Sequence, residues 1–195
     1  MLKPSDFVVL LKIVALDGQR WTYANLAESL FLSASEVHGA VKRLAESRLL
    51  QRDYTGYPKQ QLNAFNPNLT FIVEFAIHGA KFCFAPEHLR SGRGMPTGPS
   101  APLFDGVFVP GHEDIVWPWG GGTKRGPGLK PLYRMAPAAA LLDRKLYDML
   151  ALFDALRAGR ARERGMALTR LPAMIDPAIA KQQAELAATR PRPLY

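Results

Sequence analysis

The chain has 195 residues, of which 48% are hydrophobic and 10% aromatic. This composition is typical of globular proteins and excludes a wholly disordered chain. Lysine and arginine number 25 against 17 aspartates and glutamates, and the formal net charge is +8. Such a basic balance favours polyanionic partners, with nucleic acid ahead of an anionic membrane.

The compartment is predicted from two features of the chain. Cys83 is the only cysteine, so no intrachain disulfide can form, and a reducing compartment fits. The apolar run near the N-terminus is interrupted by Lys12 and follows Pro4 and Asp6, which is unlike a signal peptide. No stretch approaches the roughly 18 to 20 apolar residues of a membrane span. We expect a cytoplasmic protein without membrane contact.

Two short helices are predicted at the N-terminus. Residues 5–17 have apolar positions at helical spacing, with Ser5 as the predicted cap and Gly18 as the stop. Residues 23–32 form the second helix, and Thr22 caps it. The brief connector between them is expected to be extended.

A third helix is predicted to begin after Ser33. Ser33 and Glu36 have the spacing of a capping box, in which each side chain satisfies a backbone amide of the other residue. Beyond Leu50 the sequence predicts two short extended runs that flank a turn. The turn residues are Thr55, Gly56 and Pro58.

The middle of the chain changes in composition. Residues 68–78 are apolar at helical spacing and are expected to end at Gly79, and residues 81–84 (KFCF) are a candidate strand. Residues 85–131 hold 8 of the 16 prolines and 10 of the 16 glycines, which excludes most regular helix. The same segment is rich in large apolar groups, so we expect it to be ordered, irregular and partly β.

The last third of the chain, from Pro137, is predicted to be helical. Five apolar side chains recur there at spacings of four, three, four and three, which is one face of a helix. They are the candidate dimer interface: Leu142, Leu146, Met149, Phe153 and Leu156. Four arginines follow and are expected to be solvated, or else to contact phosphate or a partner: Arg157, Arg160, Arg162 and Arg164.

These elements predict an α+β fold in two regions. Residues 1–65 form the first, with three helices and two strands. Residues 66–195 form the second, which combines a helix, the irregular Pro/Gly-rich segment and C-terminal helices for dimerisation or partner binding.

The third helix has two unlike flanks. At about 100° per residue its small apolar side chains fall on one flank, together with Arg48: Ala34, Val37, Ala40, Val41 and Leu44. Short polar groups fall opposite: Ser35, His38, Gly39, Lys42 and Glu46. A glycine inside a helix costs roughly 1 kcal/mol relative to alanine, and close approach of a DNA groove would explain it. The polar flank is therefore predicted to contact DNA.

The order of helix, helix, turn, S-x-S-x-V-x-x-A-V-K-R-L and two-stranded turn resembles the winged helix-turn-helix domain of bacterial regulators, of the MarR-like kind. The resemblance covers residues 5 to about 62. It implies a recognition helix in the major groove and a β-wing on the adjacent DNA backbone. Many relatives carry Arg where Gly39 stands, so base discrimination here would rest on Ser35, His38 and Lys42, or on DNA shape.

Carried over by position, the resemblance implies a set of DNA-contacting residues. In the recognition helix they are Ser35, Glu36, His38, Gly39, Lys42 and Arg43. In the wing they are Arg52, Tyr54, Tyr57 and Lys59. Glu36 has two possible roles, because the capping box would also use its carboxylate.

No catalytic or cofactor site is predicted. The run Gly120–Gly128 lacks the spacing of a phosphate-binding loop. Neither His112, Glu113 and Asp114 nor Glu87 and His88 have a helical metal-ligand spacing. No nucleophile elbow occurs. We expect neither a metal, a cofactor nor an enzymatic activity.

The predicted function is that of a double-stranded-DNA-binding transcriptional regulator, a homodimeric repressor that reads an inverted repeat. The alternative is an antitoxin-like or adaptor protein, which binds a protein partner through residues 66–195 and uses the winged helix for autoregulation. In that case the Pro- and Trp-rich middle segment would be the binding surface.

Overall fold

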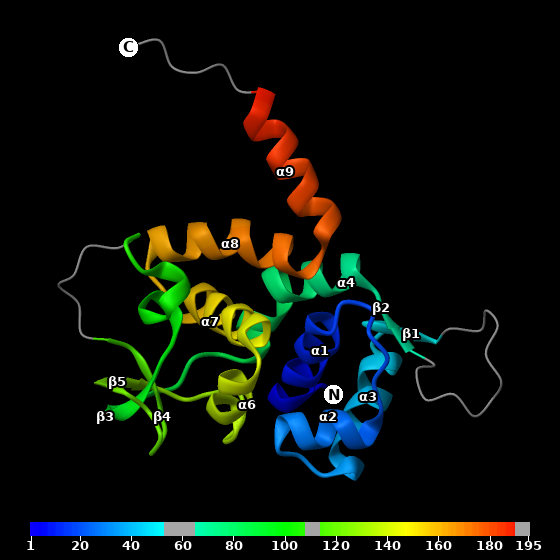
Figure 1. The fold of residues 1–195 in the computed structure, drawn as a ribbon, viewed down its shortest axis with the longest axis horizontal. Coiled ribbons are helices and arrows are strands. Elements are labelled where there is room, and N and C mark those ends of the chain that lie inside the picture. Colours follow the sequence, from blue (N-terminus) through cyan, green and yellow to red (C-terminus); the bar gives the residue numbers. More distant parts are fainter. Residues whose placement is uncertain (53–64, 108–113, 190–195) are drawn as a thin grey trace.

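The structure is a computed structural model that describes residues 1–52, 65–107 and 114–189, with side chains to residue 185. Its fold is α+β. The N-terminal helices lie at one end of the long axis, a small set of strands lies at the other, and α7 runs between them (Figure 1). Among the described residues, no helix combines the length and apolar character needed to cross a bilayer.

Three helices and a two-stranded sheet form the N-terminal part. The helices are α1 (Pro4–Ala15), α2 (Tyr23–Leu30) and α3 (Ala34–Glu46). Strand β1 (Leu50–Arg52) pairs antiparallel with β2 (Phe65–Pro67). These elements are the predicted ones. The turn predicted at residues 55–58 lies outside the described residues.

Two of the three predicted helix caps are confirmed. The Thr22 hydroxyl accepts a hydrogen bond from the backbone N–H of Asn25 (3.0 Å), and Ser33 caps α3. The prediction of Ser5 as a cap is wrong, because α1 begins one residue before it. Pro4 is already preset for the first helical turn, and the Asp6 carboxylate accepts from the Lys3 N–H at 2.8 Å.

A single helical run follows, without the predicted stop. It consists of α4 (Leu69–Glu74), a π-helical turn (Phe75–Ala80) and α5 (Lys81–Cys83). A Cβ on Gly79 would lie 2.9 Å from the Phe75 ring, so this glycine makes room for the ring and does not end the helix. The KFCF strand prediction is wrong, since residues 81–83 continue the helix.

The segment 85–131 is irregular and partly β, as predicted. Strands β3 (His88–Pro96), β4 (Val116–Pro118) and β5 (Lys124–Leu129) close into a small barrel. Strand β3 is antiparallel to both neighbours, and β4 is parallel to β5. Two short 3-10 turns, Gly98–Ser100 and Pro102–Phe104, follow β3.

Helices α6 (Ala136–Leu142), α7 (Arg144–Ala158), α8 (Ala161–Ile175) and α9 (Pro177–Thr189) complete the chain. The predicted apolar seam is interrupted at Asp143, which caps α7 and leaves Leu142 at the end of α6. Helix α9 extends away from the body (Figure 1).

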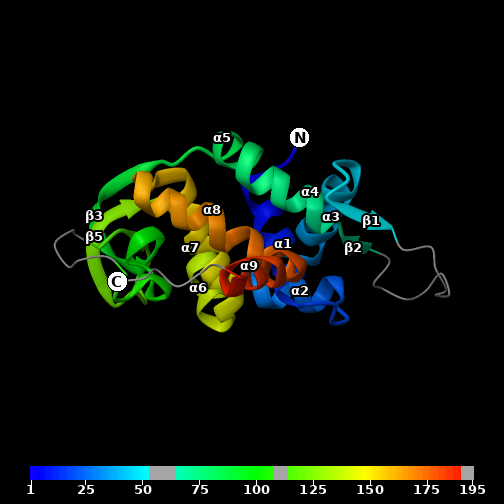
Figure 2. The ribbon, with the colours of Figure 1, turned by 90° about the horizontal axis from the view of Figure 1, so that it is seen from above.

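One hydrophobic core joins the two predicted regions. The rings of Phe7 on α1 and Phe153 on α7 lie 4.8 Å apart between centroids. Lys12 Nζ is 2.7 Å from Asp143 Oδ2, and the Tyr133 hydroxyl donates to the carbonyl of Leu30. Figure 2 shows α7 between the strands and α1. The first region is therefore held against the second.

Candidate nucleic-acid interface

The two flanks of α3 have opposite environments. Val37, Ala40, Val41 and Leu44 are buried against the rest of the chain. On the opposite flank, most of the predicted DNA-facing residues are exposed and one is half-buried: Ser35, Glu36, His38 and Lys42, with Gly39 the half-buried one. Ala34 and Arg48, predicted to face inward, are exposed instead.

The N-terminus of α3 engages the Glu36 carboxylate. The backbone N–H of Ser33 donates to Glu36 Oε2 at 2.8 Å, and the Ser33 hydroxyl donates to the same oxygen at 2.7 Å. These hydrogen bonds lower the pKa of Glu36, the backbone bond most strongly. Glu36 is thus an anionic cap, and a cap of this kind stabilises the helix dipole.

Arg43, predicted at the edge of the DNA-facing flank, pairs with a carboxylate of α1. Its Nε and Nη2 donate to the two oxygens of Asp6, at 2.7 and 2.6 Å. The Asp6 side chain is fully buried, so this bidentate pair is the means by which a buried carboxylate is satisfied. The structure gives Arg43 a role that the sequence did not predict: it joins α3 to α1.

Gly39 has an intramolecular explanation. A Cβ at Gly39 would lie 3.2 Å from Nη1 of Arg43, whose guanidinium crosses this position on its way to Asp6. The glycine therefore accommodates the arginine, and a DNA groove is not needed to explain it.

A second cluster connects α3 to the strands. The rings of Tyr23 and His38 lie 5.3 Å apart between centroids, and the Arg52 guanidinium lies 5.6 Å from the centre of the Phe65 ring. Burial raises the pKa of the Tyr23 phenol, and the nearby Arg52 charge opposes that shift. His38 and Arg52 therefore both neighbour Tyr23, and the structure brings this part of the predicted site together.

One of the four predicted wing residues lies in the described part of the chain. Arg52 is exposed at the end of β1. Tyr54, Tyr57 and Lys59 lie outside the described residues, as do His112 and Glu113, for which no metal role was expected.

A polar hollow of about 230 Å³ lies between the starts of α1 and α3. Lys3 and Arg43 contribute positive charge to its lining, and Glu36 contributes negative charge. The hollow borders the exposed flank of α3, so it belongs to the same surface. The lining residues are Lys3, Ser5, Val9, Leu32, Ser35, Glu36, Gly39, Ala40 and Arg43.

The predicted dimer seam is mostly internal. Four of its five side chains are buried within the single chain: Leu146, Met149, Phe153 and Leu156. They face α1 and α8 within the core, so the prediction that they contact a second subunit is wrong. Leu142, in contrast, is 66% exposed, and its neighbour Leu141 is 65% exposed.

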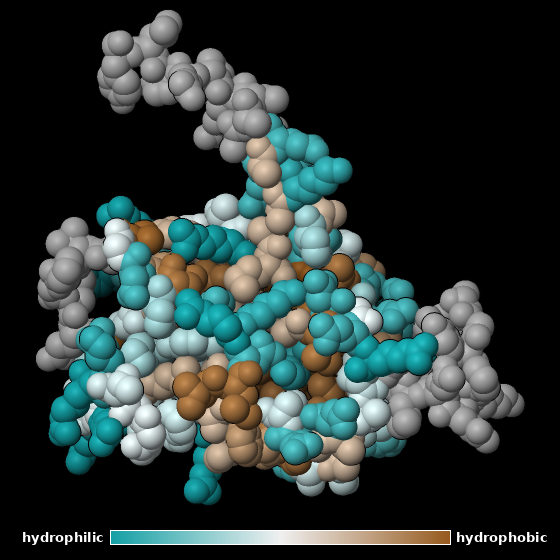
Figure 3. Space-filling view, in the orientation of Figure 1, coloured by the Kyte–Doolittle hydropathy of each residue, from teal (hydrophilic) through white to brown (hydrophobic). Residues whose placement is uncertain are grey.

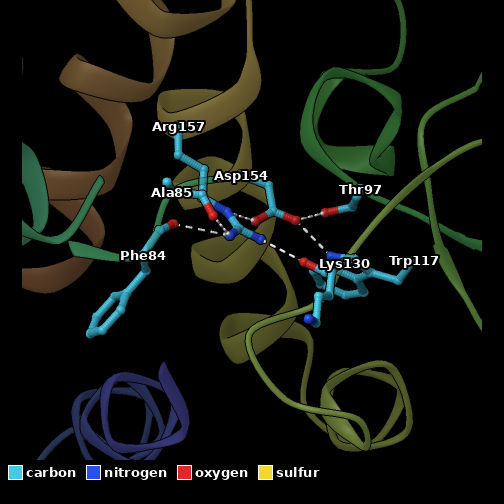
Figure 4. A network of polar contacts seen from close by, with 7 residues as sticks. All are labelled: Phe84, Ala85, Thr97, Trp117, Lys130, Asp154 and Arg157. Carbon is cyan, nitrogen blue, oxygen red and sulfur yellow. Dashed lines mark hydrogen bonds and ion pairs between the residues drawn. The ribbon is translucent and has the colours of Figure 1, made fainter. Parts of the chain in front are cut away.

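A buried polar network on α7 was not predicted from the sequence (Figure 4). Asp154 Oδ2 accepts from the Thr97 hydroxyl (2.7 Å) and the Trp117 indole (2.6 Å), and Oδ1 accepts from Arg157 Nε (2.8 Å). Arg157 also donates to the carbonyls of Phe84 and Lys130. An aspartate inside an apolar helix, three residues before an arginine, was the available signal.

This network fastens the barrel to α7 and has no free group for chemistry. Among the described residues, every buried side-chain nitrogen or oxygen has a hydrogen-bond partner. The Arg157 side chain is 3% exposed, so the expectation of a solvated arginine is wrong at this position.

Comparisons of the chain with protein-family models, curated proteins and solved structures gave no match in any of the three.

Proposed function

We propose that the chain is a cytoplasmic transcriptional regulator that binds double-stranded DNA through α3. The proposal rests on the contrast between the two flanks of this helix. One flank is buried, while Ser35, His38 and Lys42 are exposed on the other. Helix α3 is held in place by its core and by Arg43, so it can enter a groove as a rigid element.

The element order supports a winged helix-turn-helix. Helices α2 and α3 are joined by a short turn, and β1 and β2 follow at once as an antiparallel pair. A recognition helix and an adjacent ribbon are the parts that such domains place on DNA. Ser35 and His38 would contact base edges, and Lys42 and Arg52 would contact phosphates.

The regulator is proposed to be a homodimeric repressor. A dimer would present two copies of α3 to half-sites roughly 34 Å apart, on successive turns of an inverted repeat. The exposed Leu141 and Leu142 on α6 are the apolar groups that support a second subunit there. Figure 3 shows hydrophobic side chains on the surface over α6.

The test is a selection of bound duplexes from random DNA at physiological salt. We expect the purified protein to enrich an inverted repeat, and the Ser35→Ala/His38→Ala variant to lose that enrichment. Gln182→Ala, on the exposed side of α9, is the matched control and should enrich the same repeat. If the wild-type protein and the Gln182→Ala control both fail to enrich any sequence above the input pool, the proposal of sequence-specific regulation is overturned.

The second candidate, an antitoxin-like or adaptor protein, needs a different surface from the predicted one. Trp117 and Phe104 of the middle segment are buried, so they cannot bind a partner. Phe71 and Phe82, on the α4–α5 run, are 41% and 74% exposed and favour this candidate instead. A stoichiometric protein that co-purifies with the wild type and is lost with Phe82→Lys would support it.

A further inference from the structure

A second basic surface lies on the barrel, at the opposite end of the long axis from α3 (Figure 1). It is formed by three exposed arginines, here called the arginine strip: Arg90 and Arg93 on β3 and Arg125 on β5. Figure 3 shows hydrophilic side chains gathered over this end of the molecule.

The register of the sheet places two of these charges face to face. Arg93 and Arg125 are directly opposite each other across the antiparallel β3–β5 pair. Directly opposed side chains share one face, with Cβ atoms about 5 Å apart, and like charges in such a pair destabilise a sheet. A polyanion lying across both strands would remove that repulsion.

The charges of the strip are not neutralised by the rest of the described chain. The neighbouring Lys124 and Lys130 have carboxylate partners, Asp114 at 3.3 Å and Glu87 at 2.6 Å. In contrast, within residues 1–52, 65–107 and 114–189, the side chain of neither Arg90 nor Arg125 forms an ion pair or a hydrogen bond.

Arg93 is oriented by one hydrogen bond. Its Nε donates to the carbonyl of Gly122 at 2.6 Å, which leaves the terminal nitrogens of the guanidinium for another acceptor. Guanidinium groups match the paired oxygens of a phosphate better than ammonium groups do.

The scaffold beneath the strip is tightly packed. A Cβ on Gly94 would lie 2.1 Å from the carbonyl oxygen of Trp117, and one on Gly126 would lie 1.8 Å from that of Asp114. The strands therefore approach each other backbone to backbone, and the Asp154–Arg157 network fixes the barrel to α7. Charges displayed on a rigid support lose little entropy when they bind.

We propose that the arginine strip binds the phosphodiester backbone of nucleic acid, specifically duplex DNA, without reading its sequence. The binding site is separate from α3 and does not require α3 to contact DNA. An anionic membrane fits less well, because Leu89, at 38% exposure, is the one large exposed hydrophobic residue on the described part of these strands. Insertion into a bilayer surface needs a larger apolar face.

The test compares two double variants with the same loss of charge. Arg90→Gln/Arg125→Gln removes two strip charges that have no partner in the described chain. Arg164→Gln/Lys181→Gln removes two exposed charges from α8 and α9 and is the matched control. The probe is a labelled mixed-sequence duplex without the selected repeat, and its affinity is measured by fluorescence anisotropy over a range of salt.

The strip variant should bind about tenfold more weakly than wild type, and its slope of log K against log salt should be about two units shallower. The control variant, Arg164→Gln/Lys181→Gln, should keep most of the wild-type affinity and most of the wild-type salt slope. Equal behaviour of the two double variants would overturn the proposal. Strip-dependent binding to vesicles of anionic lipid, without binding to the duplex, would overturn it in favour of a membrane.

Two further measurements keep this result separate from other failures. Melting temperatures identify any variant that has lost its fold, and Arg125→Gln alone should then still reduce the slope by about one unit. The wild-type protein could fail to select a repeat while the strip variant still binds the mixed-sequence duplex more weakly than wild type. That outcome would reject the proposed role of α3 and support the proposed role of the arginine strip.

Discussion

The role of Arg43 in the structure differs from the role that its position in the sequence predicts. Its place beside Lys42 on α3 favoured a contact with phosphate, but the fully buried Asp6 uses both its Nε and Nη2. A buried carboxylate without a partner costs several kcal/mol. Arg43 is therefore a positioning residue that fixes α3 against α1.

The role of Gly39 can be tested against a second helical glycine. Gly165 lies in α8, and a Cβ there would meet nothing within 4 Å. We expect Gly165→Ala to raise the free energy of unfolding by about 1 kcal/mol, from helix propensity alone. Gly39→Ala should raise the free energy of unfolding by clearly less. The added Cβ would lie 3.2 Å from Nη1 of Arg43, and the pair with Asp6 holds that guanidinium in place.

Denaturant unfolding of both glycine variants measures the difference. If Gly39→Ala raises the free energy of unfolding as much as Gly165→Ala does, the Arg43 side chain can move aside at no cost. The glycine would then not be explained by the need to accommodate Arg43.

A substitution at Lys42 tests the proposed DNA-binding role of the exposed flank of α3. Lys42→Gln should weaken binding to the selected repeat by about 1 kcal/mol and make the salt slope about one unit shallower. Lys181→Gln on α9 is the control and should leave both unchanged. Titrations at several salt concentrations measure both quantities, and an unchanged slope for Lys42→Gln would remove this residue from the interface.

At the scale of elements, Asp143 links the first region to the second. Its Oδ1 caps α7 by accepting from the Leu146 N–H at 3.0 Å, and its Oδ2 pairs with Lys12 of α1 at 2.7 Å. Burial acts to raise the pKa of Asp143, but the hydrogen bonds and the Lys12 charge outweigh it and lower the pKa. Because the folded-state pKa is depressed, this contribution to stability is present above the unfolded pKa and is lost as the pH falls through the folded value.

Asp143→Asn tests that contribution while keeping a side chain able to cap α7. At pH 7 we expect the free energy of unfolding to fall by about 1 to 2 kcal/mol, for a pair that is mostly but not fully buried. The difference from wild type should begin to shrink below about pH 4, the ordinary pKa of an aspartate in the unfolded chain. It should disappear only as the pH falls through the lower folded-state pKa of Asp143, where the native side chain also becomes neutral. Urea unfolding at several pH values measures it, and a difference that persists unchanged at the lowest pH would contradict the ion pair.

Sequence patterns predicted the elements where local chemistry decides them. Thr22, Ser33 and Glu36 marked the starts of α2 and α3 because a cap involves residues only two or three apart. The patterns failed at residues 75–83, where Gly79 and the strand-like KFCF both lie in one helical run. That outcome depends on Phe75, whose ring fills the space left by Gly79, and on burial against distant helices.

At the scale of the whole molecule, the four internal residues of the predicted seam form the core that joins the two regions. A seam of leucines looks the same whether it packs on a second subunit or on α1 of its own chain, since both contacts are apolar. Because these four side chains are buried, they are not available to a second subunit. Leu141 and Leu142, at the end of α6, are adjacent leucines that are exposed and could contact one.

The proposed dimer can be tested at that pair. Leu141→Lys/Leu142→Lys should convert a dimer into a monomer in sedimentation velocity and leave the melting temperature within a few degrees of wild type. Leu168→Lys on α8, where the side chain is 42% exposed, is the matched control and should remain dimeric. A double variant that stays dimeric would exclude α6 from the interface.

Periodicity and capping were enough to predict the α+β class, the first three helices, the short strand pair and the polar flank of α3, because both depend on residues close together in the chain. The roles of Arg43, Gly39, Asp154 and Arg157, the burial of the α7 seam and the face-to-face arginines of the barrel became visible only in the folded chain. Each of these depends on a partner from a distant part of the sequence, and no local pattern specifies which partner the folded chain brings near.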